Sequence, residues 1–352
     1  MLMQPTLNDP LSDFTSLAVG GKAEQLYIID TSDDLLKVLD EARGKQLWIL
    51  GYGANVLISD KGLPGVTVLI RTKEILREDD LLIADAGVWW DDLVQYAISQ
   101  RLWGLELMSA IPGGVSAAVV GNIAAYGQAV ADTLQWVEVY DRSNGEVKKL
   151  AADELGLTYR YSLFQTETFA NLVILKAAFK LSQQPTTEVT YQSALDVAYA
   201  NDLDLSMLEG RRETILKTRE KAGSLWDYRT PASQMHTAGS FFRNPMVDEA
   251  TAEKLMAHDE TGKSAELLKQ MNRVHGGDTK RVSAAHVLLA AGFQRGQSWG
   301  PVRLHPDHIL KIENTGGATA QQVYDVAQEI IRTVKDKLGI ELNPEVRFLG
   351  DF

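Results

Sequence analysis

Apolar residues in the first half of the chain form short runs that alternate with longer amphipathic stretches. The runs at 47–50 and 66–70 are rich in Leu, Ile and Val and lie next to glycine or polar residues, which indicates buried strands. The stretch that begins at Ser32 places Leu35 and Leu39 on one side and reaches Gly44, which predicts a helix. Further elements are predicted as strands at 25–30, 56–58, 81–84, 134–140, 146–150 and 171–181, and as a helix at 90–100. Short strands that alternate with helices predict an α+β fold.

Helical patterns dominate the last third of the chain. The clearest helix is predicted at 319–338, where Thr319 and Gln322 form a capping box and Gly339 follows the last apolar position. Weak patterning at 190–204 predicts no element, and the polar segment 260–280 is interpreted as a helix followed by a solvated loop. The remaining predictions are helices at 209–221, 248–258 and 283–291 and strands at 309–313 and 342–349.

Composition and charge indicate a globular protein and disfavour several kinds of partner. The chain has 352 residues, enough for two or three domains, with 45% hydrophobic and 23% charged residues, which is typical of a globular protein. Its 35 basic and 47 acidic residues give a net charge of −12, which disfavours nucleic acid and anionic membrane surfaces as partners. The sequence has no cysteine, secretory signal or spanning apolar stretch, so we expect a cytoplasmic protein without disulfides or thiolate metal sites.

Two glycine-rich stretches are candidates for binding a ligand with their backbone. The first follows a predicted strand and returns to strand, so it lacks the helix of a dinucleotide-binding fingerprint; its amides could still form an anion-binding nest. The second is a run of small residues from Ile111 to Gly127, which would let the backbone approach a large flat molecule. A close-packed contact between elements is the alternative for the second run, and we favour cofactor contact.

Three further stretches carry candidate chemistry. Arg160 lies between Tyr159 and Tyr161, Ser240 follows Gly239 in a tight bend, and Glu345 follows Pro344. Each has a structural alternative: a solvated cation, a turn residue, and a surface partner of an arginine. The histidines at 305 and 308 flank a proline, which makes a metal site less favourable than packing, and no metal site is predicted.

Taken in order, these stretches resemble the UDP-N-acetylenolpyruvoylglucosamine reductase family. The matching blocks are Val19-Gly20-Gly21, Gly51-Tyr52-Gly53-Ala54-Asn55-Val56-Leu57, Ile111-Pro112-Gly113 through Asn122 with Ala125-Tyr126-Gly127, Tyr159-Arg160-Tyr161-Ser162, Ala238-Gly239-Ser240-Phe241-Phe242-Arg243-Asn244-Pro245 and Pro344-Glu345-Val346-Arg347-Phe348. The resemblance implies a two-part FAD-binding domain of the vanillyl-alcohol-oxidase (PCMH) type and a C-terminal α+β substrate domain. It places the boundaries at 1–72, 73–225 and 226–352.

The same resemblance implies an activity and three catalytic residues. NADPH would reduce FAD, and hydride would then pass to the enolpyruvyl ether of UDP-N-acetylglucosamine to give UDP-N-acetylmuramate for peptidoglycan. Arg160 would stabilise charge that spreads onto the substrate carboxylate, Ser240 would supply the proton, and a protonated or proton-sharing Glu345 would polarise the carboxylate. Donors of these types suit an enolate-like intermediate.

Binding residues carry over position by position. The implied FAD contacts are Gly51, Gly53, Ala54, Asn55, Val56, Leu57, Ile111, Pro112, Gly113, Gly114, Gly121, Asn122, Tyr126 and Gly127. The implied substrate contacts are Tyr191, typical of the longer subclass, and Lys221, Asn244 and His308. Ala117 and Ala118 replace serines found in some members, and His286 replaces an expected tryptophan.

The expected partners are a small-molecule substrate and NADPH, with no nucleic acid or membrane, for a monomeric chain. Two alternatives stay open at this point. Another FAD-dependent oxidoreductase with the same cofactor domain could act on a sugar or alcohol, without needing Ser240 as a donor. A nucleotide-sugar binding module without turnover is the second alternative, which the presence of Arg160, Ser240 and Glu345 disfavours.

Overall fold

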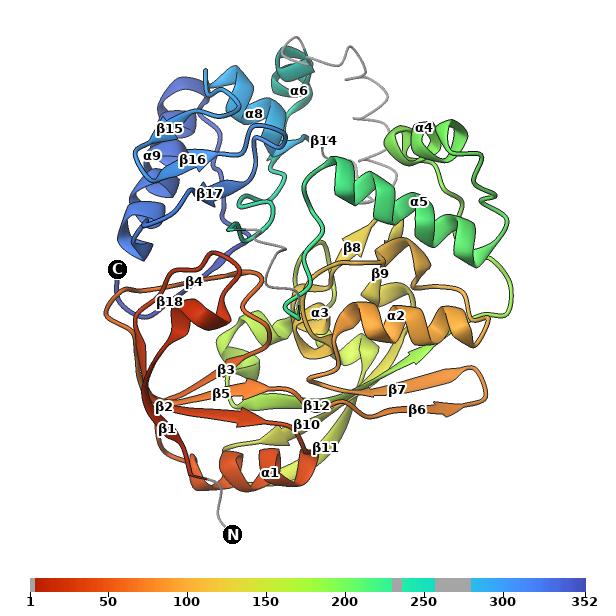
Figure 1. Cartoon of the computed structure of the whole chain (residues 1–352), viewed down its shortest axis with the longest axis vertical. Coiled ribbons are helices and arrows are strands. Elements are labelled where there is room, and N and C mark those ends of the chain that lie inside the picture. Colours follow the sequence, from red (N-terminus) through yellow and green to blue (C-terminus); the bar gives the residue numbers. More distant parts are fainter. Residues whose placement is uncertain (1–3, 230–235, 257–279) are drawn as a thin grey trace.

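The computed structural model describes residues 4–229, 236–256 and 280–352. These residues form two sheets that carry helices and a separate C-terminal lobe of helices and short strands (Figure 1). The α+β class predicted from the alternation is therefore confirmed. No helix in the described part of the chain is long and apolar enough to cross a membrane.

The first sheet has the strand order β1-β2-β5-β3. β2 (Lys22–Ile29), β5 (Leu63–Ile70) and β3 (Leu47–Leu50) are parallel, and β1 (Thr6–Pro10), which the sequence did not predict, pairs antiparallel with β2. Parallel strands of one sheet need crossover connections, and α1 (Ser32–Glu41) supplies the one between β2 and β3, which lie on either side of β5. The Thr31 side chain caps α1 by accepting a hydrogen bond from the Asp34 amide.

The second sheet is antiparallel, with the order β11-β10-β12-β7-β6. Its strands are β6 (Ile75–Glu78), β7 (Leu81–Asp85), β10 (Leu134–Asp141), β11 (Glu146–Ala151) and β12 (Leu172–Lys180). The predicted hairpin at 134–150 forms as β10 and β11. Buried residues of both sheets and of α2 (Trp90–Ser99) share one core, so the two halves of this region pack as a unit.

The small-residue run after Ile111 is not an extended loop throughout. It contains a short helix, α3 (Val115–Gly121), whose Ala118 and Val119 are buried in the shared core. The run continues into the hairpin of β8 (Ala124–Ala125) and β9 (Gln128–Ala129). The alternative of a close-packed contact therefore applies to α3, which packs closely against β7 and β12.

Two helices lead from the second sheet to the C-terminal lobe. α4 (Gln192–Ala200) lies in the segment where no element was predicted, and α5 (Leu208–Lys221) matches the predicted helix within one residue. α4 packs against α5, and only three of its residues are buried, which explains its weak pattern. Figure 1 shows both helices above α2 and away from α8 and α9.

The C-terminal lobe packs around one long helix. α9 (Ala320–Leu338) carries the predicted capping box and ends at Gly339. The other elements are β13 (Met246–Val247), α6 (Glu249–Met256), β14 (Lys280–Arg281), α8 (Ala284–Ala290), β15 (Ser298–Trp299), β16 (Val302–Leu304), β17 (Ile312–Asn314) and β18 (Arg347–Leu349). The final strand pairs parallel with β4 (Val56–Ile58), which joins the lobe to the N-terminal region.

Several predicted boundaries were wrong. The strand predicted at 309–313 begins only at Ile312, because Ile309 and Leu310 lie in a turn before it. The strand predicted at 342–349 is restricted to β18, since Pro344 lacks an amide donor for a ladder. α1 ends with Ala42 as its C-cap, two residues before Gly44. The predictions for 260–279 and for the end of the helix at 248–258 fall outside the described residues.

Candidate active site

A cavity of about 440 Å³ lies where the two sheets meet the C-terminal lobe. Both glycine-rich stretches line it, together with residues of β3, β12 and the segment before β18. Residues far apart in sequence therefore converge on one space. Nine of the predicted FAD contacts lie in its lining: Gly51, Gly53, Ala54, Asn55, Val56, Pro112, Gly113, Gly114 and Gly121.

The first glycine stretch turns sharply because Gly53 has a left-handed backbone, with φ of +65°. A Cβ atom at this position would lie 2.0 Å from the Phe14 carbonyl oxygen, so only glycine allows the approach. The turn leads Val56 into β4 at the cavity wall. Leu57, the next residue, faces the other way and is fully buried in the core of the C-terminal lobe.

The second glycine stretch presents open backbone to the cavity. Gly113 has φ of +137°, and a Cβ added there would meet no atom within 4 Å. Its carbonyl accepts a hydrogen bond from the Trp90 amide at 2.9 Å, which fixes the turn against α2. A flat ligand could therefore approach Gly113 closely without displacing protein atoms.

Four predicted FAD contacts from the second stretch lie outside the cavity lining: Ile111, Asn122, Tyr126 and Gly127. Asn122 is buried with φ of 40°, and its side chain joins two segments. It donates to the Thr158 carbonyl at 2.7 Å and accepts from the Ala131 amide at 3.0 Å. Asn122 thus supports the segment that leads to Arg160.

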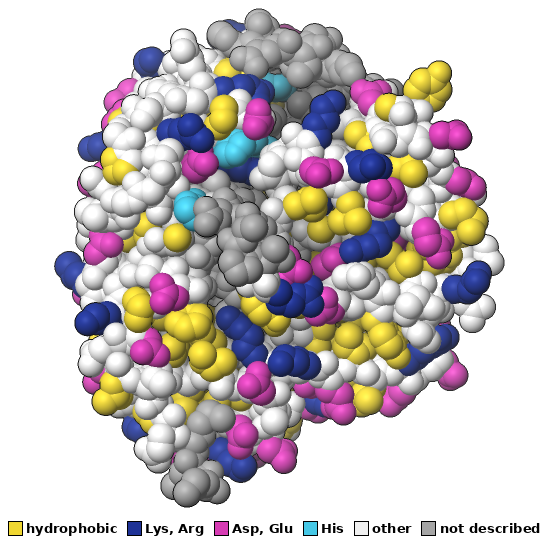
Figure 2. All heavy atoms as spheres, viewed as in Figure 1, with side chains coloured by type: hydrophobic (Ala, Val, Ile, Leu, Met, Phe, Trp, Pro, Cys, Tyr) yellow, Lys and Arg dark blue, Asp and Glu magenta, His cyan; other side chains and the backbone are white. Residues whose placement is uncertain are grey.

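Cationic side chains gather at the cavity although the chain is acidic. Arg142, Arg160, Arg243 and Arg347 line it, and Glu345 is the single carboxylate in the lining described here. On the face shown in Figure 2, acidic and basic side chains are interspersed, whereas the cavity lining holds four arginines and one glutamate. Burial and the nearby Arg243 lower the pKa of Arg347. An anionic ligand would offset this concentration of positive charge.

Buried hydrogen-bond donors also indicate that the cavity suits an anionic ligand. The Nε atoms of Arg142, Arg160 and Arg243 are buried and have no hydrogen-bond partner among the described residues. A buried donor without a partner costs about 1–3 kcal/mol, so such groups commonly mark the place of a ligand or water. Three of them around one cavity fit a ligand with several acceptor oxygens, such as a diphosphate or carboxylate.

Arg160 and Glu345 meet in this cavity. The Arg160 Nε lies 3.3 Å from Glu345 Oε1, and both side chains are about a quarter exposed, at 24% and 23%. The contact lacks hydrogen-bond geometry, which leaves the Nε–H available. Arg160 Nη2 donates to the Ala124 carbonyl at 3.0 Å, and its backbone has φ of 53°. The guanidinium is therefore held at one end while its other donors face the cavity.

Ser240 lies outside the cavity lining, but the main chain holds its segment beside Glu345. The Glu345 amide donates to the Phe241 carbonyl at 2.8 Å, and Phe242 forms an isolated bridge with Pro344. Ser240 therefore lies one residue from a direct backbone contact with Glu345. Gly239, with φ of +73°, supplies the predicted bend. Phe241 and Phe242 are buried in the C-terminal core rather than lining the cavity.

The four predicted substrate contacts lie outside the cavity lining. Tyr191 precedes α4 and packs edge-on against Tyr126, with ring centroids 5.6 Å apart. Lys221 is exposed at the end of α5. Asn244 Oδ1 accepts from the Ala284 amide at 2.9 Å and so caps α8. Burial lowers the pKa of His308 to about 4, so its imidazole is neutral at pH 7.

Lys311 is a buried charged residue that the sequence analysis missed. Its side chain is 2% exposed and donates to the Ala222 carbonyl at 2.8 Å, the Gly223 carbonyl at 2.6 Å and Ser224 Oγ at 2.7 Å. It thus joins β17 to the C-terminal end of α5, where the helix dipole favours a cation. A lysine inside the apolar run 309–312 was the available signal.

Comparisons with known proteins agree with this arrangement. The family model described as "UDP-N-acetylenolpyruvoylglucosamine reductase, C-terminal domain" matches residues 230–349, and that described as "FAD binding domain" matches 23–151. A UDP-N-acetylenolpyruvoylglucosamine reductase of Salinispora arenicola is 32% identical and covers 97% of this chain and 95% of its own. One of Thermobifida fusca is 30% identical, with 97% of both chains covered.

A solved structure also matches. The crystal structure of UDP-N-acetylenolpyruvylglucosamine reductase from Thermus caldophilus superimposes with a TM-score of 0.66 over 99% of this chain and 100% of that one. Its sequence is 23% identical, so this likeness supports the fold alone.

Proposed function

The chain belongs to the UDP-N-acetylenolpyruvoylglucosamine reductase family, and we propose that it carries out that family's reaction in the arginine-lined cavity. It is an FAD-dependent oxidoreductase that reduces UDP-N-acetylglucosamine enolpyruvate to UDP-N-acetylmuramate with NADPH, a step in peptidoglycan precursor synthesis. The observation that supports the location is the Arg160–Glu345 pair, which shares one cavity with both glycine stretches.

The residues of the cavity fit FAD. Gly113 leaves open backbone for a flat ring, and the buried Nε donors of Arg142 and Arg243 suit oxygens of a diphosphate. When bound, FAD supplies hydride transfer between NADPH and the enolpyruvyl group. The protein then has to bind both molecules, orient them and manage charge and protons.

Arg160, Glu345 and Ser240 would divide these tasks. The Arg160 donors that face the cavity would bind the substrate carboxylate and stabilise negative charge that develops there. Glu345, which lies beside the guanidinium, would polarise the same carboxylate. Ser240 would donate a proton to the adjacent carbon, a role supported by its backbone position beside Glu345.

The nucleotide part of the substrate needs further contacts. We propose Tyr191, Lys221, Asn244 and His308 for them, and the exposed ammonium of Lys221 suits a phosphate. Asn244 would contribute through its amide nitrogen, since its Oδ1 caps α8.

We also propose the organisation and setting of the chain. Two FAD-binding subdomains at 1–72 and 73–225 would precede a substrate domain at 226–352, and the change of sheet between β5 and β6 supports the first boundary. The chain would act as a monomer in the bacterial cytoplasm. Sedimentation at micromolar concentration should then give the mass of one chain, 38.8 kDa.

An anaerobic experiment tests the function. Purified protein should bind FAD and turn yellow, NADPH should bleach it, and the enolpyruvyl sugar nucleotide should restore the oxidised spectrum. Reoxidation by oxygen but not by this substrate would favour the alternative FAD oxidoreductase. Protein that takes up no FAD would contradict both.

A further inference from the structure

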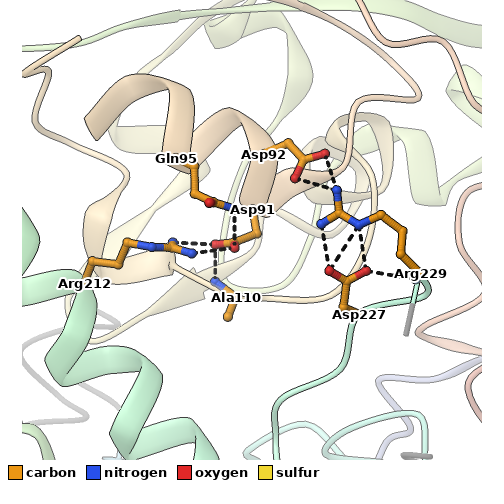
Figure 3. A network of polar contacts seen from close by, with 7 residues as sticks. All are labelled: Asp91, Asp92, Gln95, Ala110, Arg212, Asp227 and Arg229. Carbon is orange, nitrogen blue, oxygen red and sulfur yellow. Dashed lines mark hydrogen bonds and ion pairs between the residues drawn. The ribbon is translucent and has the colours of Figure 1, made fainter. Parts of the chain in front are cut away.

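Asp91 forms hydrogen bonds that connect three separate segments of the chain. It lies in the first turn of α2 and is 8% exposed. Its Oδ1 accepts a hydrogen bond from the Ala110 amide at 2.6 Å, and both oxygens accept from the Arg212 guanidinium at 2.7 Å. Gln95 Nε2 adds a contact at 3.1 Å (Figure 3). One carboxylate thus connects α2, the segment before Ile111, and α5.

The contact with Ala110 falls at a strained turn. Ala110 has φ of 55°, a left-handed conformation that costs a residue with a Cβ about 1–2 kcal/mol. It directly precedes the stretch Ile111–Gly114, and the other end of that stretch is held by the hydrogen bond from the Trp90 amide to the Gly113 carbonyl. Two consecutive residues of α2 therefore fasten both ends of the second glycine stretch.

Arg212 neutralises the charge of the buried Asp91 carboxylate and connects it to α5. Its two parallel hydrogen bonds to Asp91 fix the direction of the guanidinium, which a lysine could not do. Two helical turns further along α5, Arg219 interacts electrostatically with Asp91 and with Arg160. Movement of α5 relative to α2 would therefore shift charge near Arg160.

We propose that Asp91, with Arg212, is a positioning residue that holds the Ile111–Gly114 stretch in its flavin-binding conformation. The pair would set flavin affinity and orientation through Ala110 without touching the flavin itself. The inference rests on the proposed use of Gly113 and Gly114 as FAD contacts.

The neighbouring residue of α5 offers a matched control. Arg211 also forms an ion pair with an acidic residue of the FAD-binding region, Glu106, at 2.9 Å. That pair is the more buried of the two, with side-chain exposures of 8% and 0%. The second Glu106 oxygen accepts from the Gly104 amide at 2.8 Å, away from the glycine stretch. If the ion pairs of α5 had a purely structural role, replacing Arg211 should raise the Kd for FAD more than replacing Arg212. If the Asp91–Arg212 pair positions the glycine stretch, replacing Arg212 should raise this Kd more.

The test measures FAD affinity and thermal stability together. Full-length apoprotein of the wild type and of Asp91→Ala, Asp91→Asn, Arg212→Gln and Arg211→Gln would be titrated with FAD by flavin fluorescence, with Tm and visible circular dichroism recorded. Asp91→Ala removes a charge-assisted hydrogen bond and should raise the Kd for FAD by about tenfold to a hundredfold. Asp91→Asn keeps an acceptor for Ala110 and should raise it less.

The two arginine variants decide the question. Arg211→Gln should lower Tm more than Arg212→Gln but keep the Kd for FAD within about threefold of the wild type. Arg212→Gln should raise Kd and alter the visible circular dichroism of bound flavin. Equal changes in Kd for both arginine variants, or a wild-type Kd in Asp91→Ala, would overturn the inference.

Two further measurements keep the test decisive. If Asp91→Ala does not fold, Arg212→Lys replaces it, because lysine keeps the charge that Asp91 needs but loses the paired hydrogen bonds. An unchanged Kd and flavin spectrum in Arg212→Lys would overturn the inference. Failure of the wild type to bind FAD would instead overturn the proposed function, so the two failures are distinguishable.

Discussion

Replacing Arg160 by lysine separates the charge of this residue from its geometry. The guanidinium contacts Glu345 through Nε at 3.3 Å and the Ala124 carbonyl through Nη2 at 3.0 Å. A lysine ammonium cannot make both contacts and still present donors to the cavity, because it is a single point on a flexible stem. The Arg160→Lys variant would therefore keep the net charge and leave the substrate carboxylate with a more distant cation.

The size of the effect follows from that displacement. At an effective dielectric constant of about 20, a charge about 3.5 Å from a cation is stabilised by about 5 kcal/mol, and at about 5 Å by about 3 kcal/mol. A lost charge-assisted hydrogen bond adds about 1.5 kcal/mol. Together these changes amount to about 3 kcal/mol, or roughly a hundredfold in rate. Folding should change by about 1 kcal/mol or less, because the Arg160–Glu345 pair is partly exposed.

Stopped-flow absorbance of the flavin measures each half-reaction. In Arg160→Lys, NADPH should reduce the flavin at close to the wild-type rate, whereas reoxidation by the enolpyruvyl sugar nucleotide should slow by roughly a hundredfold. Arg303→Lys is the control, since Arg303 also pairs through Nε with a glutamate, Glu313, but lies outside the cavity lining. It should leave both half-reactions unchanged. A reoxidation rate in Arg160→Lys within about threefold of the wild type would refute the role of the guanidinium.

Three other predictions concern binding and stability. Gly113→Val should raise the Kd for FAD at least about tenfold, because its side chain would occupy the open face of the cavity. The control Gly44→Val, also at positive φ but away from the cavity, should lower stability alone. Equal Kd values in the two variants would contradict this prediction. Asp60 accepts hydrogen bonds from the Ala320 and Gln321 amides, at 2.9 and 2.8 Å, at the start of α9. Asp60→Ala should therefore lower the free energy of unfolding in urea by about 1–2 kcal/mol. The control Asp325→Ala, at an exposed position, should lower it by less than about 0.5 kcal/mol. Burial lowers the pKa of His308 from 6.5 to about 4, so between these values the unfolded chain binds a proton that the folded chain does not. Stability should therefore decrease as the pH is lowered from 6.5 to 4, by about 2.5 kcal/mol more in the wild type than in His308→Gln. Identical pH dependence in the two proteins would contradict the burial of His308.

Elements with local determinants were predictable from the sequence. α9 carries its own capping box and a continuous apolar face, and the hairpin of β10 and β11 has its own turn. By contrast, α4 has three buried residues and forms against α5, so its stability comes mainly from tertiary contact. β1 likewise exists as an edge strand because β2 provides its partner.

The candidate site likewise contains residues that could be proposed from local sequence and residues that only the fold brings together. The glycine stretches and the candidate residues Arg160, Ser240 and Glu345 could be proposed from sequence because ordered blocks carry the family resemblance. The cavity arginines Arg142 and Arg347 could not, since what brings them together is pairing between strands distant in sequence. Register and packing decide which arginines reach a shared space, and neither is encoded in a local pattern.

The positions outside the cavity have physical reasons as well. Leu57 alternates away from Val56 along β4 and so enters the C-terminal core. Asn122 takes the left-handed C-cap of α3, where its side chain satisfies two backbone groups. A match to a family block identified the segment in both cases, but the direction of the side chain depended on the fold.

The central claim is that Ser240 supplies the proton that completes reduction of the substrate. The most direct measurement compares both half-reactions in Ser240→Ala under anaerobic conditions, with Thr315→Ala, an exposed hydroxyl of the same lobe outside the cavity lining, as the control. The account predicts normal flavin reduction by NADPH and reoxidation by the enolpyruvyl sugar nucleotide slowed by about a hundredfold to ten-thousandfold in Ser240→Ala alone. Equal losses in both half-reactions, or reoxidation at the wild-type rate, would contradict it.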